Sequence, residues 1–332
     1  MDRVAQVAGT ALTALLLLCA YRDASADGGF HAEMEGNLVL QYFSNPDVPT
    51  TFGTVRPYIA AESWLTAGAR FEMYVSAWMG SEADPVLNLD ELSVRWNILP
   101  EDRLSLSLGR QYLPYGHYAT MLASAPLTLD FGSLRSSQAL IISSETIGFN
   151  EAVYWFDGSE AAAAVEEESD NGYGFRLEKS IGSDDLELTI GYDYLSNIAG
   201  AEDFFPGDTR EKLSAQGLYL NLEAESLSMT LEHLSLLDAL SAGDLQGDID
   251  RPVKPAVTRV EWTMNLGNRG DVSVALNKTH GGEQLGLVRR STTVGWQRSP
   301  NDNTTLVAEI DWLTDVDGYT DRIIGLQWIL NL

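Results

Sequence analysis

Residues 256–266 read AVTRVEWTMNL, and from Arg259 onward polar and apolar side chains alternate. Val260 and Trp262 fall on one face of an extended chain, whereas Arg259 and Glu261 fall on the other. A period of two residues is typical of a β-strand with one apolar and one polar face. The same alternation recurs in residues 91–98, 217–224 and 305–312. The chain is therefore predicted to be all-β.

The alternating segments are long, and two kinds of connection join them. Residues 214–224 and 304–312 are longer than an average strand of about 5–6 residues and reach the roughly 9–11 that a membrane-crossing strand needs. Tight polar turns, such as 100–102, alternate with longer connections, such as 157–171 and 238–253. Transmembrane barrels alternate short periplasmic turns with long outer loops in this way. We therefore expect a transmembrane antiparallel up-and-down β-barrel, with apolar faces toward lipid and polar faces toward the lumen.

The phase of the short and long connections predicts the number of strands. If the first strand begins near Gly29, short and long connections alternate without interruption only when one strand lies within residues 134–142. This gives about sixteen strands, an even number with both ends of the barrel wall on the periplasmic side. About fourteen strands remain the alternative, because residues 134–142 and 56–65 alternate poorly.

The two ends of the chain carry signals of export and assembly. An apolar run at residues 11–20 followed by Ala24-Ser25-Ala26 has the form of a signal peptide with its cleavage site. The run is too short for a membrane-spanning helix, which needs roughly 20 apolar residues. We expect a signal peptide over residues 1–26 and a barrel without cysteine over residues 27–332. The last segment alternates through Trp328, which is the usual signal to the barrel-assembly machinery and lets the final strand pair with the first.

The composition is strongly acidic and offers no catalytic motif. Asp and Glu number 48 against 21 Lys and Arg, so nucleic acid is excluded as a partner because phosphate binding needs clustered bases. Composition alone also fits a soluble secreted β-protein or an acidic extracellular enzyme. G-x-S-x-G, H-E-x-x-H and phosphate-binding loops are absent, and the four histidines lie far apart. Two acidic turns resemble fragments of calcium loops without their ligand register. We expect no enzyme, metal or cofactor.

Alternation also predicts which charged side chains line the lumen. The predicted pore-lining set has an acid excess, which favours cations in a narrow water-filled channel. Pairing of such residues across strands, as between Glu91 and Arg70, is the structural alternative. The acids are Glu72, Glu91, Glu178, Glu187, Asp193, Glu223, Glu232, Glu261, Asp271, Glu309 and Asp311, and the bases are Arg70, Arg95, Arg176, Arg259 and Arg289.

The connection at residues 113–133, LPYGHYATMLASAPLTLDFGS, differs from the acidic loops because it is apolar and poor in charge. An apolar loop is costly in water, so we expect it to pack against the protein. It either folds into the barrel mouth as a constriction, or packs against the rim or a neighbouring subunit. In the first case Tyr115, His117, Tyr118 and Met121 are the candidate constriction residues.

Residues 108–116, LGRQYLPYG, and 126–129, PLTL, resemble a segment of the LbtU-type siderophore porin family, "LG(R/K)QYxP(F/Y)G … PLTL". Residues 88–92, NLDEL, are similar to the acidic segment that precedes it in that family. The resemblance covers residues 87–132, and it implies passage of a ferric siderophore or a similar small solute without a plug domain. The chain departs from the family at residues 135–144, which are serine-rich with Arg135 as their one charge.

The sequence thus predicts a passive outer-membrane porin for small solutes, with a ferric siderophore as the favoured cargo. A general or otherwise selective cation-preferring porin is one alternative, and a barrel serving adhesion or surface structure is the other. The expected partners are outer-membrane lipid and lipopolysaccharide, the assembly machinery and the solute. A homotrimer is compatible with the same pattern.

Overall fold

The computed structural model describes residues 30–43, 54–66, 69–78, 86–99, 103–146, 148–159, 171–183, 185–199, 212–240, 252–282, 285 and 287–331; in the first three strands, only the side chain of Glu72 is described. The proposed signal peptide lies outside these residues. No helix within the described ranges is both long enough and apolar enough to cross a bilayer.

Sixteen strands occupy the described residues, together with the short helix α2 (Leu127–Gly132) and the 3-10 turn η3 (Gly267–Arg269). The strands are β1 (Phe30–Phe43), β2 (Thr54–Thr66), β3 (Ala69–Trp78), β4 (Val86–Leu99), β5 (Leu104–Tyr112), β6 (Arg135–Thr146), β7 (Phe149–Ser159), β8 (Gly172–Ser183), β9 (Leu186–Leu195), β10 (Ala215–Ala224), β11 (Leu227–Leu236), β12 (Ala256–Asn265), β13 (Asp271–His280), β14 (Arg290–Asn301), β15 (Thr304–Thr314) and β16 (Thr320–Asn331).

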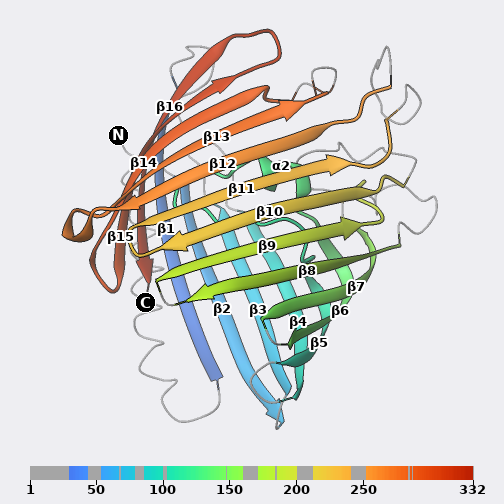
Figure 1. Cartoon of the computed structure of the whole chain (residues 1–332). Coiled ribbons are helices and arrows are strands. Elements are labelled where there is room, and N and C mark those ends of the chain that lie inside the picture. Colours follow the sequence, from blue (N-terminus) through green and yellow to red (C-terminus); the bar gives the residue numbers. More distant parts are fainter. Residues whose placement is uncertain are drawn as a thin grey trace.

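The strands form one closed antiparallel barrel, in which each strand pairs with its neighbours in sequence (Figure 1). The last strand, β16, closes on β1, with Trp328 opposite Leu38. The predicted all-β up-and-down barrel is confirmed, and the described strands favour sixteen over fourteen because β6 occupies the poorly alternating segment. Short turns such as β8–β9 and β10–β11 lie at one end, and the longer connections lie at the other. By the asymmetry of such barrels, the short-turn end is periplasmic and the long-connection end is outside.

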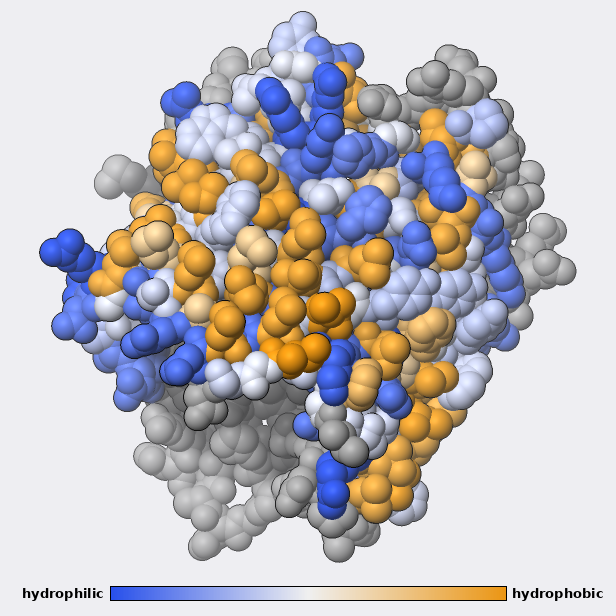
Figure 2. All heavy atoms as spheres, viewed as in Figure 1, coloured by the Kyte–Doolittle hydropathy of each residue, from blue (hydrophilic) through white to orange (hydrophobic). Residues whose placement is uncertain are grey.

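The polarity of the wall is the reverse of that in a soluble protein. On β12, Trp262 and Met264 are 39% and 52% exposed, whereas Arg259 and Glu261 are 0% and 4% exposed. Large apolar side chains are also exposed on β4, β5, β7 to β11 and β13 to β16. The face in view in Figure 2 shows such residues as orange areas. Such a surface is stable only against an apolar medium, so the outer face is the one that meets lipid.

The interior is packed at the long-connection end. An apolar cluster joins Leu113, Tyr115 and Phe131 of the β5–β6 connection to inward residues of β6 to β12, such as Ile141 and Leu234. This cluster explains the weak alternation of β6, because its inward positions carry apolar side chains that pack on the connection while its outward positions face lipid.

Glycines on the inner wall make room for this cluster. A Cβ atom at Gly174 of β8 would lie 2.3 Å from Cζ of Tyr154, and one at Gly172 would lie 2.1 Å from Cζ of Phe156. These positions on β8 admit aromatic rings from β7, and any larger residue would displace them.

Two adjacent positions on β11 test the orientation of the wall. Met229→Arg places a charge in the middle of the apolar outer face and should destabilise the protein by about 2–4 kcal/mol, as measured by guanidinium unfolding in lipid vesicles. Ser228→Arg, on the inner face, is the matched control and should cost far less. Equal costs at the two positions would contradict the assignment of the faces.

Candidate functional site

The connection from β5 to β6, residues 113–134, turns into the barrel instead of standing above it. We call it the inner loop. The N–H of Leu113 donates to the carbonyl of Leu134 at 2.9 Å, which closes the base of the inner loop. Its helix α2 contacts β11, β12 and β13, and Figure 1 shows it inside the ring of strands. The inner loop therefore runs over the inner wall of the strands that follow it.

A row of carboxylates on the wall holds the backbone of the inner loop. We call Asp193 (β9), Glu232 (β11), Glu261 (β12) and Glu309 (β15) the carboxylate row. Asp193 accepts the N–H of Gly116 at 2.8 Å, Glu232 that of His117 at 2.5 Å, Glu261 that of Met121 at 3.1 Å and Glu309 that of Ala123 at 2.9 Å. Hydrogen bonds to ionised acceptors are roughly twice as strong as neutral ones. The row thus fixes the inner loop at successive points along β9 to β15.

Two loop side chains add to this contact. Thr120 donates its hydroxyl to Oε2 of Glu261 at 2.8 Å. Ser124 donates both its N–H and its hydroxyl to Oε2 of Glu309, at 3.1 and 3.4 Å. One carboxylate oxygen of Glu309 therefore accepts several bonds from the tip of the inner loop.

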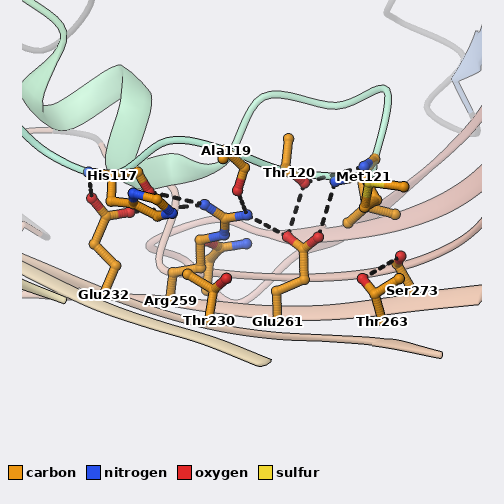
Figure 3. Close-up of polar contacts among 12 residues, drawn as sticks. His117, Ala119, Thr120, Met121, Thr230, Glu232, Arg259, Glu261, Thr263 and Ser273 are labelled. Atoms are coloured by element: carbon orange, nitrogen blue, oxygen red, sulfur yellow. Dashed lines mark hydrogen bonds and ion pairs between the residues drawn. The ribbon is translucent and has the colours of Figure 1, made fainter. Parts of the chain in front are cut away.

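Two arginines bind the carbonyls of the same stretch. Arg259 is fully buried, donates from Nη2 to the carbonyl of Ala119 at 2.6 Å, and pairs with Glu261 (Figure 3). Its Nη1 also lies 3.8 Å from Oε2 of Glu232. Arg176 of β8 donates to the carbonyl of Gly116 at 2.5 Å and pairs with the carboxylate row through Asp193 at 2.9 Å. Both guanidinium groups are thus neutralised by wall acids while they bind the loop.

His117 has an enclosed environment. Its ring stacks on Tyr219 of β10 with centroids 4.8 Å apart and an interplanar angle of 15°. Gly191 of β9 admits the Tyr219 ring, since a Cβ there would lie 2.0 Å from its Cζ. Burial lowers the pKa of His117 below its ordinary value, and the nearby Arg176 lowers it further. The enclosed position therefore favours the neutral form of the imidazole.

The described members of the predicted pore-lining set face the interior, but at different places. Arg176, Arg259, Glu261 and Glu309 lie under the inner loop. Asp311 is 6% exposed and accepts the hydroxyl of Thr293 at 2.9 Å.

The remaining predicted residues lie away from the inner loop. On the short-turn half of the wall, Glu178 accepts Nδ2 of Asn150 at 2.7 Å, and Glu223 is exposed and accepts Nδ2 of Asn221 at 2.8 Å. On β3 and β4, Glu72, Glu91 and Arg95 lie on the interior face, with Arg95 3.8 Å from Glu72. The side chain of Arg70 lies outside the described residues.

The four candidate constriction residues mainly anchor the inner loop. Tyr115 is 1% exposed in the apolar cluster, and Tyr118 packs against that cluster. His117 and Met121 donate their N–H groups to the carboxylate row. The exposed residue of this stretch is Ala119. Whether the inner loop acts as a constriction stays a prediction.

Sequence reasoning did not single out the anchoring partners. Alternation predicts Asp193 and Glu232 on the inner face without a separate role, and it gives no role to Tyr219. Glycines at inward positions of the strands are the sequence feature that could have indicated these contacts, because they leave room for a large group packed against the wall. For example, Gly295 of β14 leaves room for Leu122 of the inner loop, because a Cβ there would lie 2.4 Å from its Cδ2.

The comparison of sequences assigns no family to the chain. No protein-family model matches it. A Coxiella burnetii protein described as "UPF0422 protein" is 25% identical over an alignment of 250 residues, and the match covers 67% of this chain and 52% of that protein. The chain thus spans about half the length of this relative.

Solved structures share the fold. OprB of Pseudomonas putida at high pH has a TM-score of 0.67 and 10% identity over 94% of this chain and 96% of that one. OmpF of Salmonella typhi in complex with daunomycin gives 0.64 and 9% over 91% and 97%. An anion-selective porin from Comamonas acidovorans gives 0.61 and 12% over 91% and 100%. These likenesses establish the fold of outer-membrane porins.

The porin fold and the apolar outer face both indicate a location in a membrane. A closed barrel whose lipid-facing strands carry large exposed apolar side chains satisfies its backbone within a bilayer. The protein is a β-barrel of the bacterial outer membrane.

Glu309→Gln tests the attachment of the inner loop. The charge-assisted bonds to Ala123 and Ser124 weaken, and a buried bond to a charged group contributes about 1.5–3 kcal/mol. A spin label on Ala125→Cys, which is exposed and directly follows Ser124, should therefore become more mobile in electron paramagnetic resonance spectra. Glu223→Gln, an exposed inner-wall acid away from the inner loop, should leave the spectrum unchanged. An immobile label in the Glu309→Gln protein would contradict the attachment.

Proposed function

We propose that the protein is a passive channel for small solutes whose lumen is narrowed by the inner loop. The observation that carries this proposal is the fixing of residues 116–124 to the inner wall by the carboxylate row, inside a barrel with the porin fold. A loop held in this way is a fixed constriction of the lumen. It does not move to close the passage. Transport of this kind needs no cofactor and no bound energy source.

The proposal includes a preference for cations. Arg176 and Arg259 are bound to wall acids and to the inner loop, so their charges are offset locally. Acids remain open on the short-turn half, where Glu187 of β9 is the direct cross-strand partner of Glu223 of β10. Both are exposed and line a hollow with Asp185 and Glu225. Uncompensated carboxylates in a water-filled passage concentrate cations and repel small anions.

A ferric siderophore is the narrower hypothesis for the cargo. It rests on the resemblance of residues 108–116 and 126–129 to the siderophore porin segment. In the structure, Tyr115 is buried in the apolar cluster and Gly116 is bound to Asp193, so this segment attaches the inner loop. The resemblance therefore supports a shared loop attachment more directly than a shared solute.

The proposed partners follow from the location. They are outer-membrane lipid and lipopolysaccharide, the barrel-assembly machinery during insertion and the transported solute. Assembly into a homotrimer is part of the same proposal.

Planar-bilayer recordings test the channel and its selectivity. We expect stepwise currents and, in a potassium chloride gradient, a reversal potential of the sign that cation preference gives. The Glu187→Gln/Glu223→Gln double variant should move the reversal potential toward zero, because it removes two exposed lumen acids. Glu151→Gln is the control, since Glu151 is exposed on the outward face of β7.

Two results would count against the proposal. The absence of currents from folded protein would remove the channel function and leave adhesion or surface structure as the better explanation. A reversal potential of the opposite sign would remove the cation preference alone.

The cargo hypothesis has its own test. A deletion strain should grow more slowly than its parent when iron is supplied only as a defined ferric siderophore, and equally well when iron is supplied as a free salt. Equal growth of the two strains on each siderophore tried would reject the cargo hypothesis while leaving the channel intact.

A further inference from the structure

A continuous row of polar side chains crosses the outward face of β11 to β16 near the long-connection end. Each member is the direct cross-strand partner of the next, so the row is set by the register of the barrel. We call it the outer polar row, and its members are His233, Thr258, Lys278, Arg290, Thr314 and Thr320.

The outer polar row lies on the lipid side of the wall. Lys278 and Arg290 are exposed, whereas the adjacent Asn277 and Ser291 are buried on the inner side. The next outward row toward the short-turn end is apolar on β11 to β13, starting with Leu231. Figure 2 shows hydrophilic side chains gathered at the top of this face, above an apolar area. The row thus lies at the edge of the apolar belt on the external side.

The charge of this surface is opposite to that of the chain. The protein has 48 acidic and 21 basic residues. Nevertheless, the described outward positions of β11 to β16 contain no Asp or Glu. Near the outer polar row they carry Lys278, Arg290 and Arg322, and the histidines His233 and His280. Basic residues are therefore concentrated on this face, although the chain as a whole is acidic.

Lys278 and Arg290 are the centre of this surface. They are direct cross-strand partners, so their Cβ atoms lie about 4.5–5.5 Å apart, and like charges in this arrangement are destabilising. Arg290 donates Nε to the hydroxyl of Thr314 at 3.2 Å, and neither basic side chain forms an ion pair with a carboxylate of the described residues. An anion between the two side chains would turn this repulsion into attraction.

We propose that the outer polar row binds the phosphate groups of an outer-leaflet saccharolipid of the lipopolysaccharide class. Phosphate oxygens accept bonds from the planar guanidinium and from the ammonium group. The acyl chains of such a lipid would lie along the apolar belt below Lys278 and Arg290. Phosphates in the outer leaflet sit at the level where the apolar belt ends, which is the level of the outer polar row.

The binding test uses the full mature barrel in phosphatidylcholine nanodiscs and a fluorescent lipopolysaccharide as the probe. Lys278→Gln/Arg290→Gln should bind it about 25-fold more weakly, because each basic side chain near an anionic lipid surface contributes about fivefold. Arg298→Gln is the matched control, an exposed outward arginine at the short-turn end of the same strand, and should bind like the unchanged protein. Lys278→Arg should retain binding and shows that the site tolerates a conservative change.

Enzymatically dephosphorylated lipopolysaccharide tests whether the phosphates of the lipid are the bound groups. We expect its affinity for the unchanged protein to be as low as the affinity of the intact lipid for the double variant. Equal affinity for both lipids would overturn the proposal, as would unchanged binding by a folded double variant. If the double variant instead lost an oligomer while lipid binding stayed the same, the outer polar row would be an interface between copies and not a lipid site. None of these outcomes depends on channel currents.

Discussion

The structure depends on the mutual satisfaction of buried charges on the wall and the backbone of the inner loop. Glu232 is 0% exposed and Glu261 is 4% exposed, positions at which an unpaired carboxylate would be costly. The inner loop lacks a strand partner for residues 116–124, so its N–H groups would also be unpaired inside the barrel. Each set supplies bonds to the other, although Oε2 of Glu232 and Nε of Arg259 have no hydrogen-bond partner among the described residues. The same contact explains why Arg259 is tolerated at 0% exposure, since it bridges wall acids and loop carbonyls.

This arrangement divides the interior into two parts. At the long-connection end, an apolar cluster of inward residues of β6 to β12 packs with the inner loop, next to the carboxylate row and its two arginines. Toward the short-turn end, the inward residues of β9 and β10 include the exposed acids Glu187 and Glu223. Glycines of the wall contribute to the packed part, because Gly174 and Gly191 leave room for the rings of Tyr154 and Tyr219 beside the inner loop. The passage is therefore shaped by packing at one end and by charge at the other.

Alternation along single strands was sufficient to predict the barrel and the inward side of β12, because one strand already shows which side chains share a face. It was insufficient for β6, because its inward Ala139 and Ile141 belong to the apolar cluster and its inner face is therefore not uniformly polar. It also could not show which lumen charges the loop covers. That depends on contacts between distant residues, such as Gly116 with Asp193 and Thr120 with Glu261. The overall acidity of the chain likewise gave no indication of the bases gathered in the outer polar row, since only the register of β12 to β15 brings them together.

The most direct test of the inner loop's position is a disulfide between Leu122→Cys and Gly295→Cys. The sequence has one cysteine, Cys19, which the proposed signal-peptide cleavage removes. A Cβ at Gly295 would lie 2.4 Å from Cδ2 of Leu122, so two cysteines there are within reach of a disulfide. We expect the oxidised double variant to contain this bond, seen by mass spectrometry of its peptides, and to resist thiol labelling. Two free thiols that react with an externally added maleimide in the folded barrel would show that the inner loop does not lie against β14, and would contradict the account.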